Sequence, residues 1–343
     1  MSIEIVKNIH LAAHTTLHVG GVADYFVEVS STQELIQALR FAAQNAAPVF
    51  MLGGGSNVLF PDSGYHGLVI KNTISWYDIN EHDSTVLVSV GAGTNWDEFV
   101  ATMCQKNYWG VENLSSIPGT VGATPIQNVG AYGVEVSHVI ESVTAINSET
   151  CAEKTFTPAE CHFAYRDSFF KTAEGKKWVV TAVTFTLSKK PQPNLAYADL
   201  HPLHTQENLT ATQVRDFVKT VRSKKFPDWS VVGTAGSFFK NPIVSAVDYR
   251  RLQALYPDMP AYQTANGDWK LSLGWLLDKV CGLKGYCVGE VCLYENQALV
   301  LTNTGDSATA IVEFVQYIIS HVYEKTQVSI EPEVLLVGVS KTH

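Results

Sequence analysis

The sequence predicts an α+β fold, and three observations lead to that prediction. Near the N-terminus, a helical pattern at 31–43 is followed by a short apolar strand at 49–52 and a glycine loop at 53–57. Strand patterns dominate the middle of the chain, and helical patterns dominate its last third. This combination of helices and strands indicates an α+β fold.

The first elements follow from capping and apolar spacing. Ser31 and Glu34 have the spacing of a capping box and precede apolar residues at helical intervals, which predicts a helix start. Pro48 ends this pattern. Strands are expected at 49–52 and 68–70, because both are short apolar runs bounded by turn residues.

Later elements are predicted in the same way. Valines alternate at 86–90 as in a strand, Thr94 and Asp97 indicate the start of a second helix, and 178–187 is expected to be a long strand. Further helices are expected at 214–225, 245–255, 271–281 and 308–325, with a final strand at 328–337.

Size and composition narrow the class of protein. A chain of 343 residues corresponds to roughly two to three domains. Lys and Arg number 24 against 33 Asp and Glu, a net charge of −9 that disfavours nucleic acid as a partner. No stretch of about 18 apolar residues occurs, so we expect a soluble, cytoplasmic protein that does not use a membrane. The six cysteines form no CxxC pair, so we expect reduced structural thiols and no metal site.

The glycine loop Gly53-Gly54-Gly55 is followed by Ser56 and Asn57. Adjacent glycines let backbone N–H groups approach an anion, as in phosphate-binding loops. The loop matches neither GxxxxGK[ST] nor a GxGxxG that opens a helix. Alone, it would more often be a tight turn.

A second loop, IPGTVGATPIQNVGAYG at 117–133, combines glycines with hydrogen-bonding side chains. Such a loop is suited to a large, polar, multi-ring ligand. A structural Ω-loop is the alternative and would be favoured if the segment stood alone.

These two loops occur with four further motifs: HTTLHVGG at 14–21, AYRDSFF at 164–170, GSFFKNP at 236–242 and EPEV at 331–334. Together they resemble the UDP-N-acetylenolpyruvoylglucosamine reductase family over nearly the whole chain. The resemblance implies an FAD-binding unit of the FAD-linked oxidase type at 1–70 and 71–226, and a substrate domain at 227–343. It also implies an oxidoreductase of peptidoglycan synthesis, expected to be monomeric, in which NADPH reduces FAD and the flavin reduces UDP-N-acetylglucosamine enolpyruvate.

Three catalytic residues are implied by the resemblance. Arg166 would hold the substrate carboxylate, Ser237 would donate a proton, and Glu333 would assist it. From the residues alone, Arg166 beside Asp167 reads as a surface ion pair, and a serine after glycine reads as a turn residue. Glu331 lies two residues before Glu333, on the same face of the expected strand, so spacing does not choose between them.

The remaining implied residues bind ligands. The residue after the glycines is Ser56 rather than His, so FAD should be bound noncovalently. Leu335 stands where some relatives have a basic residue, which puts one flavin contact in doubt. The implied substrate residues are Tyr132, Tyr197, Lys225, Asn241 and Gln297. The implied FAD contacts are Gly53, Gly54, Gly55, Ser56, Asn57, Ile117, Pro118, Gly119, Gly122, Ala123, Gln127, Asn128, Gly130, Tyr132 and Arg166.

Two other functions stay open at this point. An oxidase of the same fold would have its flavin reduced by an alcohol or sugar and reoxidised by oxygen. A catalytically silent protein would bind the nucleotide sugar without a working flavin site. Bleaching of the flavin by NADPH separates the first from a reductase, and a colourless purified protein would indicate the second.

Overall fold

The computed structural model describes residues 3–338, and the chain divides into two compact units. The first unit contains the chain up to Ile9, Ala23–Gly55 and Tyr65–Arg222. The second contains His10–Val22, Ser56–Gly64 and the chain from Ser223 onward. Helices and strands are mixed in both, which confirms the α+β prediction. The finer division at 70 and 226 remains a prediction.

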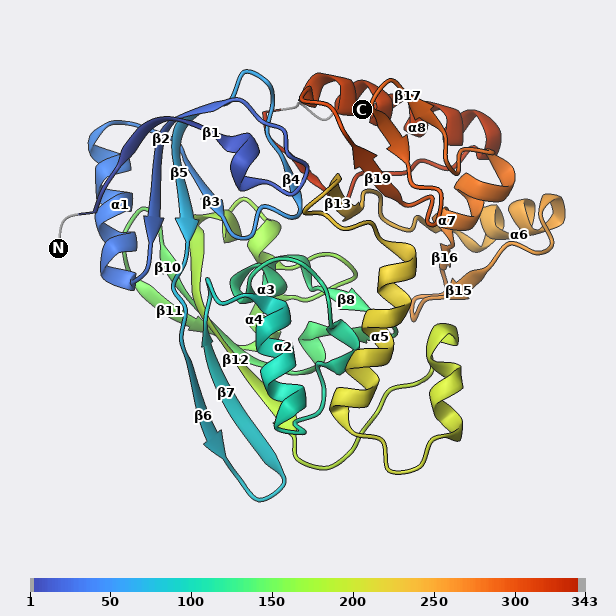
Figure 1. The fold of residues 1–343 in the computed structure, drawn as a ribbon, viewed down its shortest axis with the longest axis horizontal. Coiled ribbons are helices and arrows are strands. Elements are labelled where there is room, and N and C mark those ends of the chain that lie inside the picture. Colours follow the sequence, from blue (N-terminus) through green and yellow to red (C-terminus); the bar gives the residue numbers. More distant parts are fainter. Residues whose placement is uncertain (1–2, 339–343) are drawn as a thin grey trace. The chain divides into compact units, whose positions relative to one another are not determined.

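One sheet of the first unit has the order β1-β2-β5-β3, in which β2, β5 and β3 are parallel (Figure 1). Helix α1 (Thr32–Gln44) packs on this sheet because its apolar face, including Leu35 and Leu39, joins the core of Leu68 and Ile70. The predicted strand at 49–52 is confirmed. The strands are β1 (Val6–His10), β2 (Val22–Val29), β3 (Val49–Leu52) and β5 (Tyr65–Asn72).

The capping box predicted for α1 is wrong in one of its two bonds. The Ser31 side chain accepts from the Glu34 amide at 3.3 Å, as expected. The Glu34 carboxylate, however, accepts from the amide and hydroxyl of Ser30, at 2.7 and 2.8 Å. Ser30 provides both an N–H and an O–H to that carboxylate.

The second sheet of this unit is antiparallel, with the order β11-β10-β12-β7-β6. Helix α2 (Trp96–Gln105) contributes Trp96 and Phe99 to its core, where both rings contact Phe185. Asn95, rather than the predicted Thr94, caps α2 by accepting from the Glu98 amide. The strands are β6 (Tyr77–Glu81), β7 (Thr85–Gly91), β10 (Ile140–Asn147), β11 (Glu153–Phe156) and β12 (Trp178–Ser188), and the short helix α4 spans Pro158–Cys161.

The second unit is built on the sheet β13-β19-β18-β17, against which the long helix α8 (Ala308–Thr326) packs. A three-stranded sheet β14-β16-β15 and the pair β4-β20 complete it. Within residues 3–338, no helix is both long and apolar enough to cross a membrane. The strands are β4 (Val58–Leu59), β13 (Gly233–Ser237), β14 (Ile243–Val244), β15 (Ala261–Gln263), β16 (Trp269–Leu271), β17 (Cys287–Val288), β18 (Val291–Leu293), β19 (Val300–Asn303) and β20 (Leu335–Leu336).

The helices predicted at 214–225, 245–255 and 308–325 are confirmed as α5 (Ala211–Lys225), α6 (Ala246–Leu255) and α8. The prediction at 271–281 is only partly right. Leu271 pairs with Ala261 in a sheet, so the helix starts later, as the single turn α7 (Leu273–Trp275), and continues as a π-helix at 276–280.

The predicted final strand at 328–337 is mostly wrong. Only Leu335 and Leu336 form a strand, in parallel with β4. Pro332 lacks an amide donor, and the segment before β20 makes one isolated bridge, to Phe239. Val328 and Ile330 are buried in the core and alternate with exposed Ser329 and Glu331, but this segment lacks the continuous hydrogen-bonded ladder of a strand.

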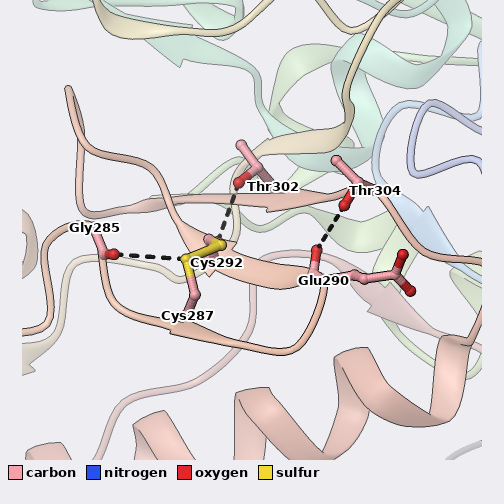
Figure 2. The surroundings of a disulfide bond; sticks show 6 residues. All are labelled: Gly285, Cys287, Glu290, Cys292, Thr302 and Thr304. Carbon is pink, nitrogen blue, oxygen red and sulfur yellow. Dashed lines mark hydrogen bonds between the residues drawn. A yellow bond between two sulfur atoms is a disulfide. The ribbon is translucent and has the colours of Figure 1, made fainter.

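The expectation that all cysteines are reduced is also wrong. Cys287 and Cys292 are directly opposite each other in the β17-β18 hairpin and form a disulfide (Figure 2). Their separation of five residues gives no CxxC signal, because only the hairpin register brings the two side chains together. Cys104 and Cys161 do fit the structural expectation, since burial raises the pKa of each thiol to about 12.

Ser307 is the N-cap of α8, and Asp62, from a distant part of the sequence, accepts further N–H groups of the first turn. Its carboxylate accepts from the amides of Ala308 and Thr309, at 2.6 and 2.9 Å, and from the Thr309 hydroxyl at 2.7 Å. Desolvation alone would raise the pKa of Asp62, but these hydrogen bonds outweigh it and lower the pKa. The negative charge also lies at the positive end of the helix dipole.

We expect Asp62→Ala to lower the free energy of unfolding by about 1 kcal/mol at neutral pH, the usual contribution of a cap. The folded-state pKa is depressed, so this stabilisation is present above the ordinary pKa and disappears as pH falls through the folded value. The unfolding free energies of wild type and variant should therefore converge as the pH falls below the ordinary pKa of an aspartate. Asp258→Ala, at an exposed aspartate of the same unit, is the control. An equal loss at every pH would contradict the charge argument.

Candidate functional site

The two glycine loops of the first unit touch each other. A Cβ on Gly54 would lie 2.9 Å from the Gly119 Cα, and a Cβ on Gly53 would lie 2.7 Å from the Thr120 Oγ1. Both contacts are closer than a side chain permits. At Gly54 the neighbour is backbone, so the two loops approach this closely there only because the position is glycine, whereas at Gly53 the neighbour is a side-chain oxygen.

The first loop presents unused backbone donors. Within residues 3–338, no group of the chain accepts the amide N–H groups of Gly53, Gly54 and Gly55. Gly55 is buried and has a φ of 66°, in the left-handed region. A buried backbone donor is nearly always satisfied, so the N–H of Gly55, which follows the more exposed Gly53 and Gly54, fits an anionic group such as the pyrophosphate of FAD.

The second loop is held by the N-terminus of α2. The Trp96 amide donates to the Gly119 carbonyl at 3.1 Å, and the Val121 amide donates to the Thr94 carbonyl at 2.9 Å. The segment is more regular than an open loop, since it contains a 3₁₀ turn at Val121–Ala123 and the short helix α3 (Thr124–Gln127).

Ser116, at the entrance to this loop, is fixed by two charged side chains. Its amide donates to the Asp97 carboxylate at 2.5 Å, and its carbonyl accepts from Arg222 at 3.2 Å. Asp97 also forms a bidentate ion pair with Arg215, at 2.5 and 2.9 Å. Desolvation would raise the pKa of Asp97, but the bonds from Arg215 and Ser116 outweigh it and lower the pKa.

Arg166 lies at the tip of a tight turn in which Ala164 and Asp167 exchange backbone hydrogen bonds. Its φ of 54° is in the left-handed region, which is costly for a residue with a side chain. The guanidinium donates to the Gly130 carbonyl at 2.6 Å, and a Cβ on Gly130 would lie only 3.0 Å from its Nη1. The structure thus brings Arg166 onto the second loop.

Tyr132 and Tyr197 contact each other edge to face, with ring centroids 5.2 Å apart. Tyr132 is 8% exposed, whereas Tyr197 is 43% exposed. Burial raises the pKa of Tyr132 to about 12 despite the opposing charge of Arg222, so its phenol is neutral. The two rings therefore form one aromatic contact in which the Tyr132 ring is buried and the Tyr197 ring is accessible.

Asn128 also lies in this region, but its side chain is used within the chain. Its side-chain NH₂ donates to the Glu135 carboxylate at 2.8 Å and to the Ala164 carbonyl at 2.9 Å. Its side-chain oxygen accepts from the Ser137 backbone amide. These bonds connect the second loop to the Arg166 turn. A ligand contact by Asn128 would have to come from its backbone.

In the second unit, Ser237 and Glu333 are neighbours. Ser237 ends β13 opposite Val300, and the Glu333 amide donates to the carbonyl of the next residue, Phe238, at 2.7 Å. The alternative, Glu331, has its carboxylate 2.8 Å from the Lys240 amine. Glu333 rather than Glu331 is therefore the glutamate whose backbone adjoins the serine.

Of the other predicted residues of the second unit, Asn57 contacts this pair, and the rest make hydrogen bonds elsewhere in the unit or end a helix. The side-chain amide of Asn57 donates to the Glu333 backbone carbonyl at 3.3 Å. Asn241 accepts from the Leu273 amide at 3.0 Å, and Gln297 from the Leu299 amide at 3.3 Å. Lys225 ends α5, a helix terminus that favours positive charge.

Sequence reasoning missed several residues that hold this site, namely Asn113, Arg215 and Arg222. One signal was available for the arginines. They are seven residues apart in α5, and Arg215 lies on the face that buries Val214 and Val218. A charge on the apolar face of an amphipathic helix indicates a buried partner, here Asp97.

Comparisons with known proteins agree with this arrangement. The sequence profile of an FAD binding domain matches residues 23–150, and that of the UDP-N-acetylenolpyruvoylglucosamine reductase C-terminal domain matches 227–337. UDP-N-acetylenolpyruvoylglucosamine reductase from Blochmanniella pennsylvanica is 41% identical over 96% of this chain and 94% of its own length. The Salmonella typhimurium reductase is also 41% identical, over 94% of both chains.

A solved structure is similar over the whole length. The crystal structure of UDP-N-acetylenolpyruvylglucosamine reductase from Thermus caldophilus has a TM-score of 0.69 at 26% identity and covers 98% of this chain and 99% of its own. The sequence identity and coverage of these relatives show the family of this chain. The two adjoining glycine loops are consistent with its FAD-binding domain. The chain belongs to the UDP-N-acetylenolpyruvoylglucosamine reductase family.

Proposed function

We propose that this protein reduces UDP-N-acetylglucosamine enolpyruvate to UDP-N-acetylmuramate at the expense of NADPH, through bound FAD. One hydride and one proton add across the carbon–carbon double bond, and NADPH becomes NADP⁺. The contact between two glycine loops with unused amide donors carries the proposal, together with membership of the family. We place the reaction in peptidoglycan precursor synthesis, in the cytoplasm, and propose a monomer.

The first unit supplies most residues proposed to hold FAD noncovalently. The amides of Gly53, Gly54 and Gly55 would donate to the pyrophosphate, and the loop around Gly119 and Gly122 would accept close approach of the cofactor. Ser56 and Asn57 extend the same loop in sequence. FAD, when bound, supplies the two-electron chemistry that no side chain provides. The other proposed contacts are Ile117, Pro118, Ala123, Gln127, Asn128, Gly130, Tyr132 and Arg166.

Charged and aromatic groups are proposed to bind the nucleotide sugar. Arg166 would pair with the carboxylate of the enolpyruvyl group, since a guanidinium matches a carboxylate in geometry and charge. Lys225 would neutralise an anionic part of the substrate. Tyr132 and Tyr197 would pack on it, and Asn241 and Gln297 would hydrogen-bond to it.

Ser237 is proposed to donate the proton. Hydride addition leaves an electron pair on the carbon beside the carboxylate, and a hydroxyl close to that carbon can protonate it. Arg166 would stabilise the negative charge before the proton arrives. Glu333, whose backbone adjoins Phe238, would assist Ser237.

Asp97→Asn should weaken FAD binding by roughly tenfold, because the amide cannot balance the charge of Arg215, which is 9% exposed. The Ser116 amide would then have only a neutral acceptor, which Arg215 also uses. Flavin content of the purified protein and titration of the apoprotein with FAD measure the effect. Asp216→Asn, on an exposed position of α5, should leave it unchanged. Normal FAD affinity with a lower melting temperature would limit the ion pair to a folding role.

Lys225→Ala should raise KM for the nucleotide sugar and leave flavin content unchanged, since the lost charge concerns the ligand more than the fold. Steady-state kinetics with varied substrate measures this. Lys224→Ala, at the exposed neighbouring lysine, is the matched control. An unchanged KM with normal kcat would reject the role of Lys225.

Ser237→Ala tests the proposed reaction itself. We expect kcat to fall about 10²- to 10⁴-fold, the usual reach of general acid catalysis. Flavin reduction by NADPH should stay near the wild-type rate, because that half-reaction needs no proton from the serine. Stopped-flow absorbance follows reduction by NADPH and reoxidation by the enolpyruvyl substrate separately. If the variant runs both half-reactions at wild-type rates, Ser237 is only a turn residue. If the substrate does not reoxidise the reduced flavin of the wild-type protein, the proposed function is refuted.

A further inference from the structure

Asn113 is a buried residue that joins two distant segments of the first unit. It lies in the 3₁₀ turn Glu112–Leu114 and is 1% exposed. Its side-chain amide donates to the Tyr132 carbonyl at 3.0 Å and to the Asn194 carbonyl at 2.8 Å. Both acceptors are carbonyl oxygens, so the NH₂ end of the side chain must face them.

Asn194 connects the same two segments a second time. Its amide donates to the Gly133 carbonyl at 3.3 Å, and its oxygen accepts from the Ala196 amide at 3.2 Å. We call Asn113 and Asn194 the asparagine clasp. The clasp ties the turn at 132–133 to the segment at 194–196.

Each tied segment carries a tyrosine that needs external support. Tyr132 has a φ of 49°, which a residue with a side chain adopts only when its surroundings hold it there. Tyr197 is 43% exposed, so burial does not fix its ring. The two rings contact each other, 5.2 Å between centroids, and the clasp holds the Tyr132 backbone and the segment that leads into Tyr197.

We infer that Asn113 is a positioning residue that sets the orientation of Tyr132 and Tyr197 for the nucleotide sugar. It acts through two backbone carbonyls. What the tyrosines bind rests on the proposed function, whereas the clasp itself does not. The inference therefore has one test that is independent of activity and one that is not.

The first test is hydrogen exchange by mass spectrometry in Asn113→Leu, which keeps the approximate volume and removes both donors. Peptides covering 194–197 should exchange faster than in wild type, since the Ala196 amide loses its anchored partner. Asn72→Leu is the matched control, because Asn72 is also buried and donates to a carbonyl, that of Val180. Unchanged exchange at 194–197 in Asn113→Leu would overturn the inference whatever the protein catalyses.

The second test is kinetic. Asn113→Leu should raise KM for UDP-N-acetylglucosamine enolpyruvate about tenfold, the effect of losing one to two hydrogen bonds. The rate of flavin reduction by NADPH should change less than KM does, because Tyr197 is proposed to contact only the nucleotide sugar, whereas Tyr132 is a proposed contact of both ligands. A lower melting temperature with an unchanged KM would reduce Asn113 to a structural residue and overturn the inference.

A double-mutant cycle identifies the group through which Asn113 acts. In a Tyr197→Ala background, Asn113→Leu should raise KM far less than in wild type, because the residue being positioned is gone. Full additivity would contradict action through Tyr197.

If Asn113→Leu fails to fold, Asn194→Ala removes the second half of the clasp at a less buried position and should give the same exchange and KM changes. If the wild-type protein does not reduce the nucleotide sugar, the proposed function is refuted. The hydrogen-exchange result would still decide whether Asn113 holds the segment at 194–197.

Discussion

The ion pair between Asp97 and Arg215 is the interaction on which the candidate site of the first unit depends. It joins α2 to α5, and the same carboxylate accepts the Ser116 amide at the entrance to the second loop. A neutral side chain at either position would leave the other charge partly buried without a partner. One ionised group thereby fixes two helices and the loop that the N-terminus of α2 holds.

Backbone conformation at the site depends on this support. Ser116, Asn128, Tyr132 and Arg166 all have positive φ, although each carries a side chain. Such residues persist only where surrounding bonds determine them, and here those bonds come from Asp97, Arg222, Asn113 and neighbouring turns. The bonds that hold these four conformations indicate a preorganised surface rather than a flexible loop.

The second unit shows how distant parts of the sequence build one local arrangement. The end of β13 brings Ser237 next to the segment that carries Glu333 through a backbone bond to Phe238. Asp62, from the N-terminal part, accepts N–H groups of the first turn of α8, and β4 pairs with β20 near the C-terminus. These long-range contacts also explain why local patterns failed at 271–281 and 328–337, where sheet pairing and core packing overrode helix and strand periodicity.

The sequence by itself determined the α+β class, most helices, the two glycine loops and the family, because these depend on local spacing and on motifs read in order. It also indicated Ser237, Glu333 and Arg166, but only through resemblance. Tertiary structure decided which groups hold the site. Asn113 and Arg222 look ordinary in sequence, since a hydrogen bond to a carbonyl 19 or 106 positions away leaves no periodic signal. The Cys287–Cys292 disulfide was likewise decided by hairpin register. Local patterns encode elements, whereas pairing between elements depends on three-dimensional proximity that only the folded chain creates.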